Sequence, residues 1–179
     1  GPSKRIGSAD DLIGGARMLM NLGFPLEAAA ILSGNIFQES GWNGQQTPWI
    51  LRSHGETWEN EGLISWNRGR LTRAKAFLKK DVHEASNVEQ VKWIKEELRQ
   101  YGLLDEFMDP NRSWEDRKKD SKKYIGWGSL GDRWDYALQA LNGVKRGEWG
   151  TFTPAPSLSA VEGSHFAGLL GDFMKAKGK

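Results

Sequence analysis

Apolar residues recur at helical spacing along most of the chain, and glycine- and proline-containing segments interrupt the pattern. Asp10 or Asp11 can cap a first helix that continues to about Asn21. Pro25 suits the first turn of a second helix, and Gly41 suits the position just past its end. Further helices are predicted over 71–80, 87–101, 114–124 and 132–144. Ser86 and Glu89 have the spacing of a capping box at the start of the helix over 87–101.

Two segments depart from the helical pattern. Residues 41–62 are rich in Gly, Asn, Gln, Trp and charge, and form the longest irregular stretch of the body. Long loops in compact domains are usually functional. Residues 62–66 (Gly-Leu-Ile-Ser-Trp) are a short apolar run that predicts one strand of a small hairpin. The expected fold class is therefore α+β, predominantly α-helical.

The chain divides into four expected parts. Residues 1–8 combine what looks like the remnant of a cleaved tag with an N-terminal arm, and 9–149 form one domain. Residues 150–163 are rich in Pro, Ser and Thr and read as a linker. Residues 164–179 carry apolar positions at i, i+3 and i+4, which predicts an amphipathic helix. This helix is expected to dock on its own domain; a partner subunit is the alternative, and its shortness disfavours a membrane surface.

Glu39 is the most informative single residue. Counting back by helical steps meets Ile36, Asn35, Leu32 and Ala28, so the carboxylate continues a mostly apolar stripe just where the helix ends. A partly desolvated carboxylate at such a boundary suits the role of a general acid. The alternative is a structural role, in which Glu39 bonds neighbouring backbone groups or a buried ion-pair partner.

Composition narrows the function classes. The chain has 179 residues, of which nine are Trp. Its formal net charge of +2 suits binding to an anionic polymer but is too small to indicate nucleic acid. Without Cys there is no disulfide or thiol nucleophile, and His54, His83 and His165 lack the spacing of a metal site, so neither a metal nor another cofactor is expected. No apolar run approaches about 20 residues, so no membrane span is expected.

Three segments together resemble the phage tail lysozyme family of the lysozyme-like superfamily, to which goose-type lysozymes and lytic transglycosylases are related. The segments are Gly34-Asn35-x-x-x-Glu39-Ser40-Gly41-x-Asn43, Gly62-Leu63-Ile64-Ser65-Trp66-x-x-Gly69-Arg70 and Gln90-x-x-Trp93-x-x-x-Glu97-Leu98. Their order and spacing carry the resemblance, which covers about residues 10–143. Ser65 departs from the family, which commonly has Gln there, and this affects the expected substrate preference more than the chemistry.

The resemblance implies a lysozyme-like catalytic domain that cleaves the β-1,4 bond between N-acetylmuramic acid and N-acetylglucosamine in bacterial peptidoglycan. Glu39 would be the catalytic acid, and the hairpin around 62–66 a wall of the substrate cleft. The resemblance also implies a phage origin, with action on the periplasmic or extracellular cell wall from a virion tail or during host lysis. Phage tail or baseplate proteins are then the candidate partners of the C-terminal helix.

Glycoside cleavage usually needs a second carboxylate. Glu56, Glu59 and Glu61 lie on the loop expected to cross the cleft, and Glu56 is favoured because Gly55 and Thr57 suit an exposed turn. The alternatives are that all three are solvated charges, or that the sugar's own groups complete the reaction and give a 1,6-anhydro product, as in lytic transglycosylases.

Seven further residues are candidates for substrate binding: Asn35, Trp42, Asn43, Ser65, Trp66, Arg70 and Gln90. Several have structural alternatives. Asn35 suits a hydrogen bond to the acid, an orienting bond to the loop or a purely structural role. Trp66 suits a hairpin core, Arg70 suits pinning the hairpin, and Gln90 with Glu97 suits a buried polar tie to Arg70. At the level of function, a non-catalytic wall-binding tail module remains an alternative, whereas the absent Cys and scattered His disfavour a peptidase or amidase.

Overall fold

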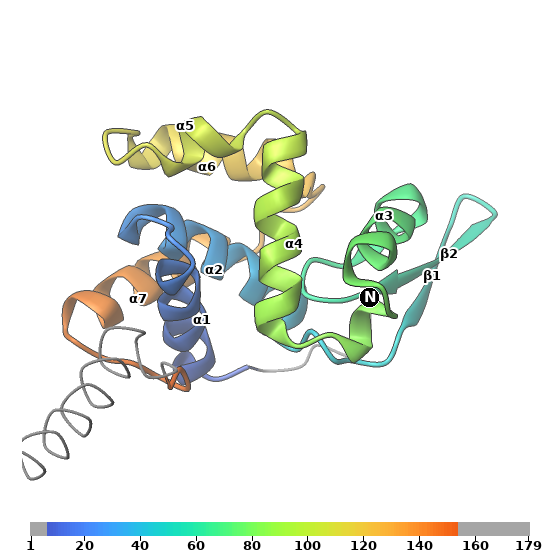
Figure 1. Cartoon of the computed structure of the whole chain (residues 1–179), viewed down its shortest axis with the longest axis horizontal. Helices are drawn as coiled ribbons and strands as arrows, with labels where there is room; N and C mark the ends of the chain where they lie inside the picture. The colour runs from blue at the N-terminus through green and yellow to red at the C-terminus, as the bar shows by residue number, and fades with distance from the viewer. Residues whose placement is uncertain (1–6, 154–179) are drawn as a thin grey trace, which may run out of the picture.

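The computed structural model describes residues 7–153, which form an α+β domain dominated by helices (Figure 1). The elements are α1 (Ala9–Asn21), α2 (Leu26–Ser40), β1 (Trp49–Ser53), β2 (Glu56–Glu61), β3 (Trp66–Asn67), α3 (Arg68–Leu78), the 3-10 helix η1 (Val82–Glu84), α4 (Asn87–Gln100), α5 (Leu104–Met108), α6 (Trp114–Ile125) and α7 (Arg133–Lys145). The expected class is confirmed. The expected C-terminal helix, 164–179, lies outside the described residues.

Helices α1, α2 and α7 pack together as one group, and α2 lies at the centre of it. Ala28, Ala29 and Ala30 are fully buried, because small side chains let neighbouring helices approach α2 on several sides. The approach is closest at Gly34, where an added Cβ would lie 2.6 Å from both Arg133 O and Ala137 N of α7. This contact fixes the end of α2 against the beginning of α7.

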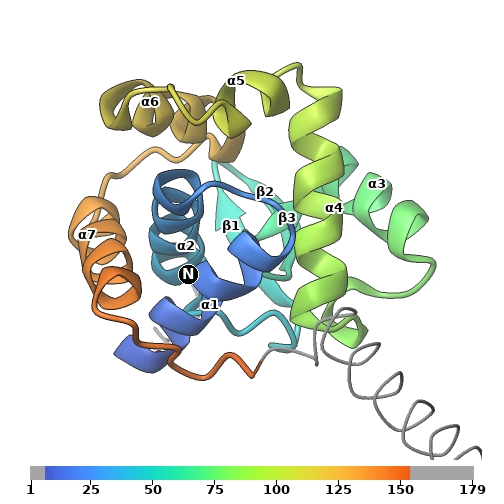
Figure 2. The same cartoon turned by 60° about the vertical axis from the view of Figure 1, so that its left-hand side comes forward.

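In Figure 1, helix α4 stands between this helical group and the part of the molecule formed by α3 and the sheet, and Figure 2 shows α3 on the opposite side of α4 from α1, α2 and α7. Its capping box is present as predicted, with Ser86 Oγ accepting from Glu89 N and the Glu89 side chain accepting from Ser86 N. Gln90 and Glu97 both point inward from α4 and are fully buried. The helix therefore joins the two parts of the domain through buried polar groups.

The sheet corrects two sequence predictions. Residues 49–61, expected to be irregular, form an antiparallel β1–β2 hairpin whose two-residue turn, His54-Gly55, has positive φ at both positions. Residues 62–65, expected to be a strand, are instead the turn between β2 and β3, and only Trp66 and Asn67 pair with β2. Buried Leu63 and Ile64 explain the apolar run: the turn itself is part of the core.

Most predicted helix limits are confirmed to within a few residues. Gly41 adopts the left-handed conformation past the end of α2, as predicted. The first helix begins slightly earlier than expected, because Ser8 caps it and Asp11 completes a capping box. Thr151 donates its backbone N–H to Asp10 O, so the first residues of the expected linker pack on α1. Within residues 7–153, no helix is long and apolar enough to cross a membrane.

Candidate functional site

Glu39 lies in the last turn of α2, and its side chain is 19% exposed. The stripe that leads to it is buried as predicted, since Ala28, Leu32, Asn35 and Ile36 have no exposed surface. Immediately after Glu39 the chain turns through Gly41, so the carboxylate stands at the boundary between the core and solvent. A carboxylate placed in this way can contact a ligand while remaining partly desolvated.

Arg133, the first residue of α7, holds the Glu39 side chain. Its Nη2 donates to Glu39 Oε1 at 3.0 Å and its Nη1 donates to Asn35 Oδ1 at 3.2 Å. The Arg133 side chain is only 4% exposed, and this burial lowers its pKa, against the opposing effect of Glu39. Asn35 in turn donates to Ser121 Oγ of α6 at 3.2 Å. The carboxylate is thus held by a buried network that joins three helices.

Of the roles expected for Asn35, its position in the structure fits positioning rather than substrate contact. It is fully buried and acts on Glu39 through Arg133. Arg133 itself was missed in the sequence, although a signal was present. It lies on the same helical face as Ala137, Ala140 and Leu141, and a cation that opens such an apolar stripe needs a buried partner.

The turn at 62–65 lies beside the end of α2. Ser40 Oγ donates to Leu63 O at 2.7 Å, and Leu63 N donates to Gln90 Oε1 at 2.9 Å. Gln90 also donates to the carbonyls of Gly44, Val82 and Ala85. Gln90 thus ties loops together within the core and presents no surface to a substrate. Ser65, with φ of 60°, is the partly exposed member of the turn.

Behind this turn lies a buried cluster around Glu97. Arg70 makes two hydrogen bonds to its carboxylate, at 2.7 and 3.0 Å, while Trp66 Nε1 and Tyr124 Oη also donate to it, at 3.0 and 2.7 Å. Burial is the largest single effect and lowers the pKa of Arg70, but the hydrogen bond to Glu97 and the electrostatic effects of Tyr124, Glu97 and Tyr101 together outweigh it, so the pKa is raised. Burial raises the pKa of Tyr124. Through Glu97, Arg70 therefore ties the beginning of α3 to α4 and to Trp66 of β3, which agrees with its structural alternative.

Both predicted sugar-stacking tryptophans lie in the core instead. Trp66 is 1% exposed and packs behind the turn, and Trp42 is 6% exposed with its Nε1 donating to Ser33 Oγ at 3.0 Å. For Trp66 the sequence already favoured a place in the hairpin core, whereas for Trp42 stacking on a sugar ring was the expectation. Asn43, next to Trp42, is partly exposed. Of the predicted binding residues, Asn43 and Ser65 are the ones on the partly exposed side of the loops near Glu39.

The structure does not bring Glu56 into the network around Glu39. Glu56 opens β2 directly after the hairpin turn, its side chain is 65% exposed, and it forms an ion pair with Arg68. Glu59 is also exposed, whereas Glu61 is fully buried and hydrogen-bonded to His83. Within residues 7–153, the charged partner of Glu39 is a cation, Arg133.

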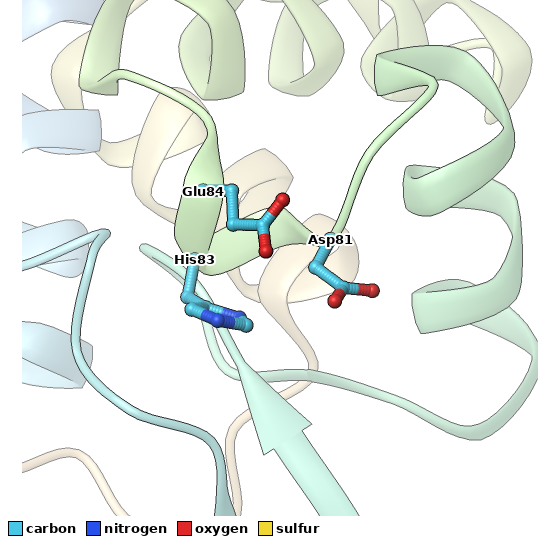
Figure 3. A group of neighbouring side chains, drawn as sticks. All are labelled: Asp81, His83 and Glu84. Carbon is cyan, nitrogen blue, oxygen red and sulfur yellow. The ribbon is translucent and has the colours of Figure 1, made fainter.

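A second group of titratable side chains lies at η1, where Asp81, His83 and Glu84 are close together (Figure 3). One possible ligand atom from each lies within 4.8 Å of the others. The pKa of His83 is raised, mainly by its hydrogen bond to Glu61. Lys75 Nζ lies 3.6 Å from Asp81 Oδ1 and 3.9 Å from Glu61 Oε2. The Lys75 ammonium lies near the carboxylates of Glu61 and Asp81, and His83 bonds Glu61, so these residues form an ion-pair network within the protein.

Comparisons with protein-family models, curated proteins and solved structures found no match to this chain. The geometry around Glu39 and the sequence resemblance are therefore the grounds for assigning a function.

Proposed function

We propose that the protein is a lysozyme-like glycosidase that cleaves the β-1,4 bond between N-acetylmuramic acid and N-acetylglucosamine in peptidoglycan. The observation that carries the proposal is the placement of Glu39. It is a half-buried carboxylate at a helix end, held by buried Arg133 and Asn35 beside the Ser65 turn. Glu39, Asn35 and Ser65 belong to the segments that resemble the phage tail lysozyme family, whereas Arg133 lies outside them.

In the proposed reaction, protonated Glu39 donates its proton to the glycosidic oxygen as the bond from that oxygen to C1 breaks. Arg133 then stabilises the carboxylate that forms, through the hydrogen bond seen in the structure. Water adds to the positively charged C1 and returns a proton to Glu39. If the sugar's own 6-hydroxyl attacks C1 instead, the product is a 1,6-anhydro sugar and the protein is a lytic transglycosylase.

A Glu39→Gln variant tests the proposal, because glutamine keeps the shape and the contact with Arg133 but has no proton to donate. Purified sacculi are digested with the wild type, with Glu39→Gln and with a Glu106→Gln control, whose carboxylate is exposed on α5. Mass spectrometry of the released muropeptides should show fragments from the wild type and the control only. Their reducing or anhydro ends distinguish a hydrolase from a transglycosylase.

One observation favours a second function: the carboxylate of Glu39 is paired with a cation, as in a purely structural ion pair. A non-catalytic wall-binding tail module would sediment with sacculi and release no soluble fragments. Wild-type protein that behaves in this way, or Glu39→Gln protein that still digests sacculi, would overturn the glycosidase proposal.

A further inference from the structure

A groove of about 410 Å³ lies between α6 and the first turn of α7. Its lining comes from three consecutive parts of the chain, namely the outer face of α6, the loop 126–132 and α7. The residues are Glu115, Lys118, Lys119, Lys122, Trp127, Gly128, Leu130 and Trp134. It therefore combines a row of cations with two indole rings.

The aromatic part of the groove remains partly open. Trp127 and Trp134 meet edge to face with ring centroids 5.4 Å apart, and both are partly exposed. Leu130 beside them is 48% exposed. A large aromatic ring that stays accessible offers an apolar surface with a polar edge, which fits the C–H face of a sugar ring. The two tryptophans that were predicted to stack on sugars are buried, but these two are not.

The charged part of the groove is unbalanced. Three lysines face one glutamate, and Glu115 is already paired with Lys118 at 3.2 Å. Lys118 also lies over the Trp134 ring, 4.9 Å from its centroid. Lys119 and Lys122, three residues apart on α6, form no ion pair with any described residue. Cations that lack protein partners beside an apolar surface favour an anionic ligand.

The groove is linked directly to the network around Glu39. The Arg133 guanidinium lies 4.3 Å from the centroid of Trp127 and also donates to Glu39. The loop is fixed to α2 as well, because Asp132 N donates to Gln38 Oε1 at 2.9 Å. The neighbouring sugar units of a glycan strand bound at Glu39 can therefore reach the groove.

From these contacts we propose that the groove binds the carboxylate-bearing units of a peptidoglycan strand, with sugar rings on Trp127 and Trp134 and carboxylates at Lys119 and Lys122. The inference rests on the proposed function, and it makes the groove responsible for selecting an anionic glycan over a neutral one such as chitin. The main alternative occupant is single-stranded nucleic acid, which also combines anionic groups with stacking surfaces.

The experiment measures binding rather than cleavage, using the full chain carrying Glu39→Gln so that the ligand is not consumed. Affinities are measured for soluble peptide-bearing glycan fragments, neutral chitin oligomers and a single-stranded oligonucleotide. The test variant adds Lys119→Gln with Lys122→Gln. The matched control adds Lys92→Gln with Lys145→Gln, two exposed lysines elsewhere in the domain. Melting curves establish that both variants are folded.

We expect the test variant to bind the peptide-bearing fragments about 3- to 10-fold more weakly than the control, and with less dependence on salt. Its affinity for chitin oligomers should not change. Equal affinity of the test and control variants for the fragments, no binding of fragments, or tighter binding of the oligonucleotide would overturn the inference. These outcomes are distinct from failure of the proposed function, which is read from the digestion of sacculi by the wild type.

Discussion

Arg133 and Glu39 form a 3.0 Å ion pair at the point where the backbones of α2 and α7 touch. The two residues are 94 positions apart in the chain, and they meet because Gly34 leaves no side chain between the helices. A feature of packing therefore determines where the candidate acid stands. It also makes Arg133 a positioning residue whose effect can be measured separately from that of Glu39.

Changing Arg133 to Gln should lower kcat on peptidoglycan more than it raises KM, because the carboxylate loses its orienting partner, whereas Trp127 loses only the guanidinium that lies over its ring. A misplaced catalytic group costs about 10- to 100-fold in rate. Arg133→Lys should recover only part of the loss, since an ammonium cannot bond Glu39 and Asn35 with the same fixed fork. Arg73→Gln, at an exposed position on α3, is the control. Unchanged kcat in Arg133→Gln would contradict a positioning role.

Changing Gly34 to Ala should destabilise the fold by about 1–3 kcal/mol, because the new methyl group would press on the α7 backbone. Gly69→Ala is the matched control. It also lies within a helix, but its Cβ would meet only the end of the flexible Arg73 side chain, at 3.3 Å. Alanine there should stabilise the protein slightly. Urea denaturation measures the stability of both variants. Equal midpoints would show that α2 and α7 can move apart without a loss of stability.

The sequence predicts features with local causes. Pro25 and Gly41 delimit α2 through their own backbone preferences, and the stripe from Ala28 to Ile36 is visible within a single helix. The β1–β2 hairpin was missed because its strands carry Glu, Asn and Arg, and its main signal is the His54-Gly55 turn. Unlike Asn-Gly, this pair is not a strong hairpin signal.

The candidate site was only partly predictable, since its partners come from distant segments. Glu39 was identified because its own helix shows that it is partly buried. Whether Trp66 faces solvent or the core depends on Glu97 and Tyr124, which are more than 30 residues away. A single sequence contains the periodicity of each helix but not the register in which one helix meets another.

Changing Glu97 to Gln should lower the free energy of unfolding by about 3–5 kcal/mol, because it leaves the partly buried guanidinium of Arg70 without a charged partner. Tyr124 and Trp66 would also lose part of their acceptor. Glu96→Gln, on the neighbouring position of α4, is the control, since its partner Arg99 lies in solvent and its loss should have little effect. If thermal unfolding shows the two variants to be equally stable, the contacts of Glu97 with Arg70 and Trp66 do not stabilise the fold.

The ion pair between His83 and Glu61 should make stability depend on pH. The folded-state pKa of His83 is raised above its ordinary value of 6.5, so its stabilising effect is complete below about pH 6.5 and is lost as the pH rises through the folded value. Asp81 and Glu84 act in the same direction, and Lys75, near Glu61 and Asp81, retains part of the neutralisation at higher pH. Urea midpoints measured from pH 6 to 9 should therefore fall in the wild type.

A His83→Gln variant should lack this fall, whereas a His54→Asn variant should retain it. His54 lies in the exposed hairpin turn, and asparagine tolerates the positive φ of that position. The chemical shift of the His83 ring, followed by NMR over the same range, reports the protonation directly. A ring that titrates at or below pH 6.5, or a wild type and His83→Gln variant with the same pH profile, would show that Glu61 does not bind the imidazolium.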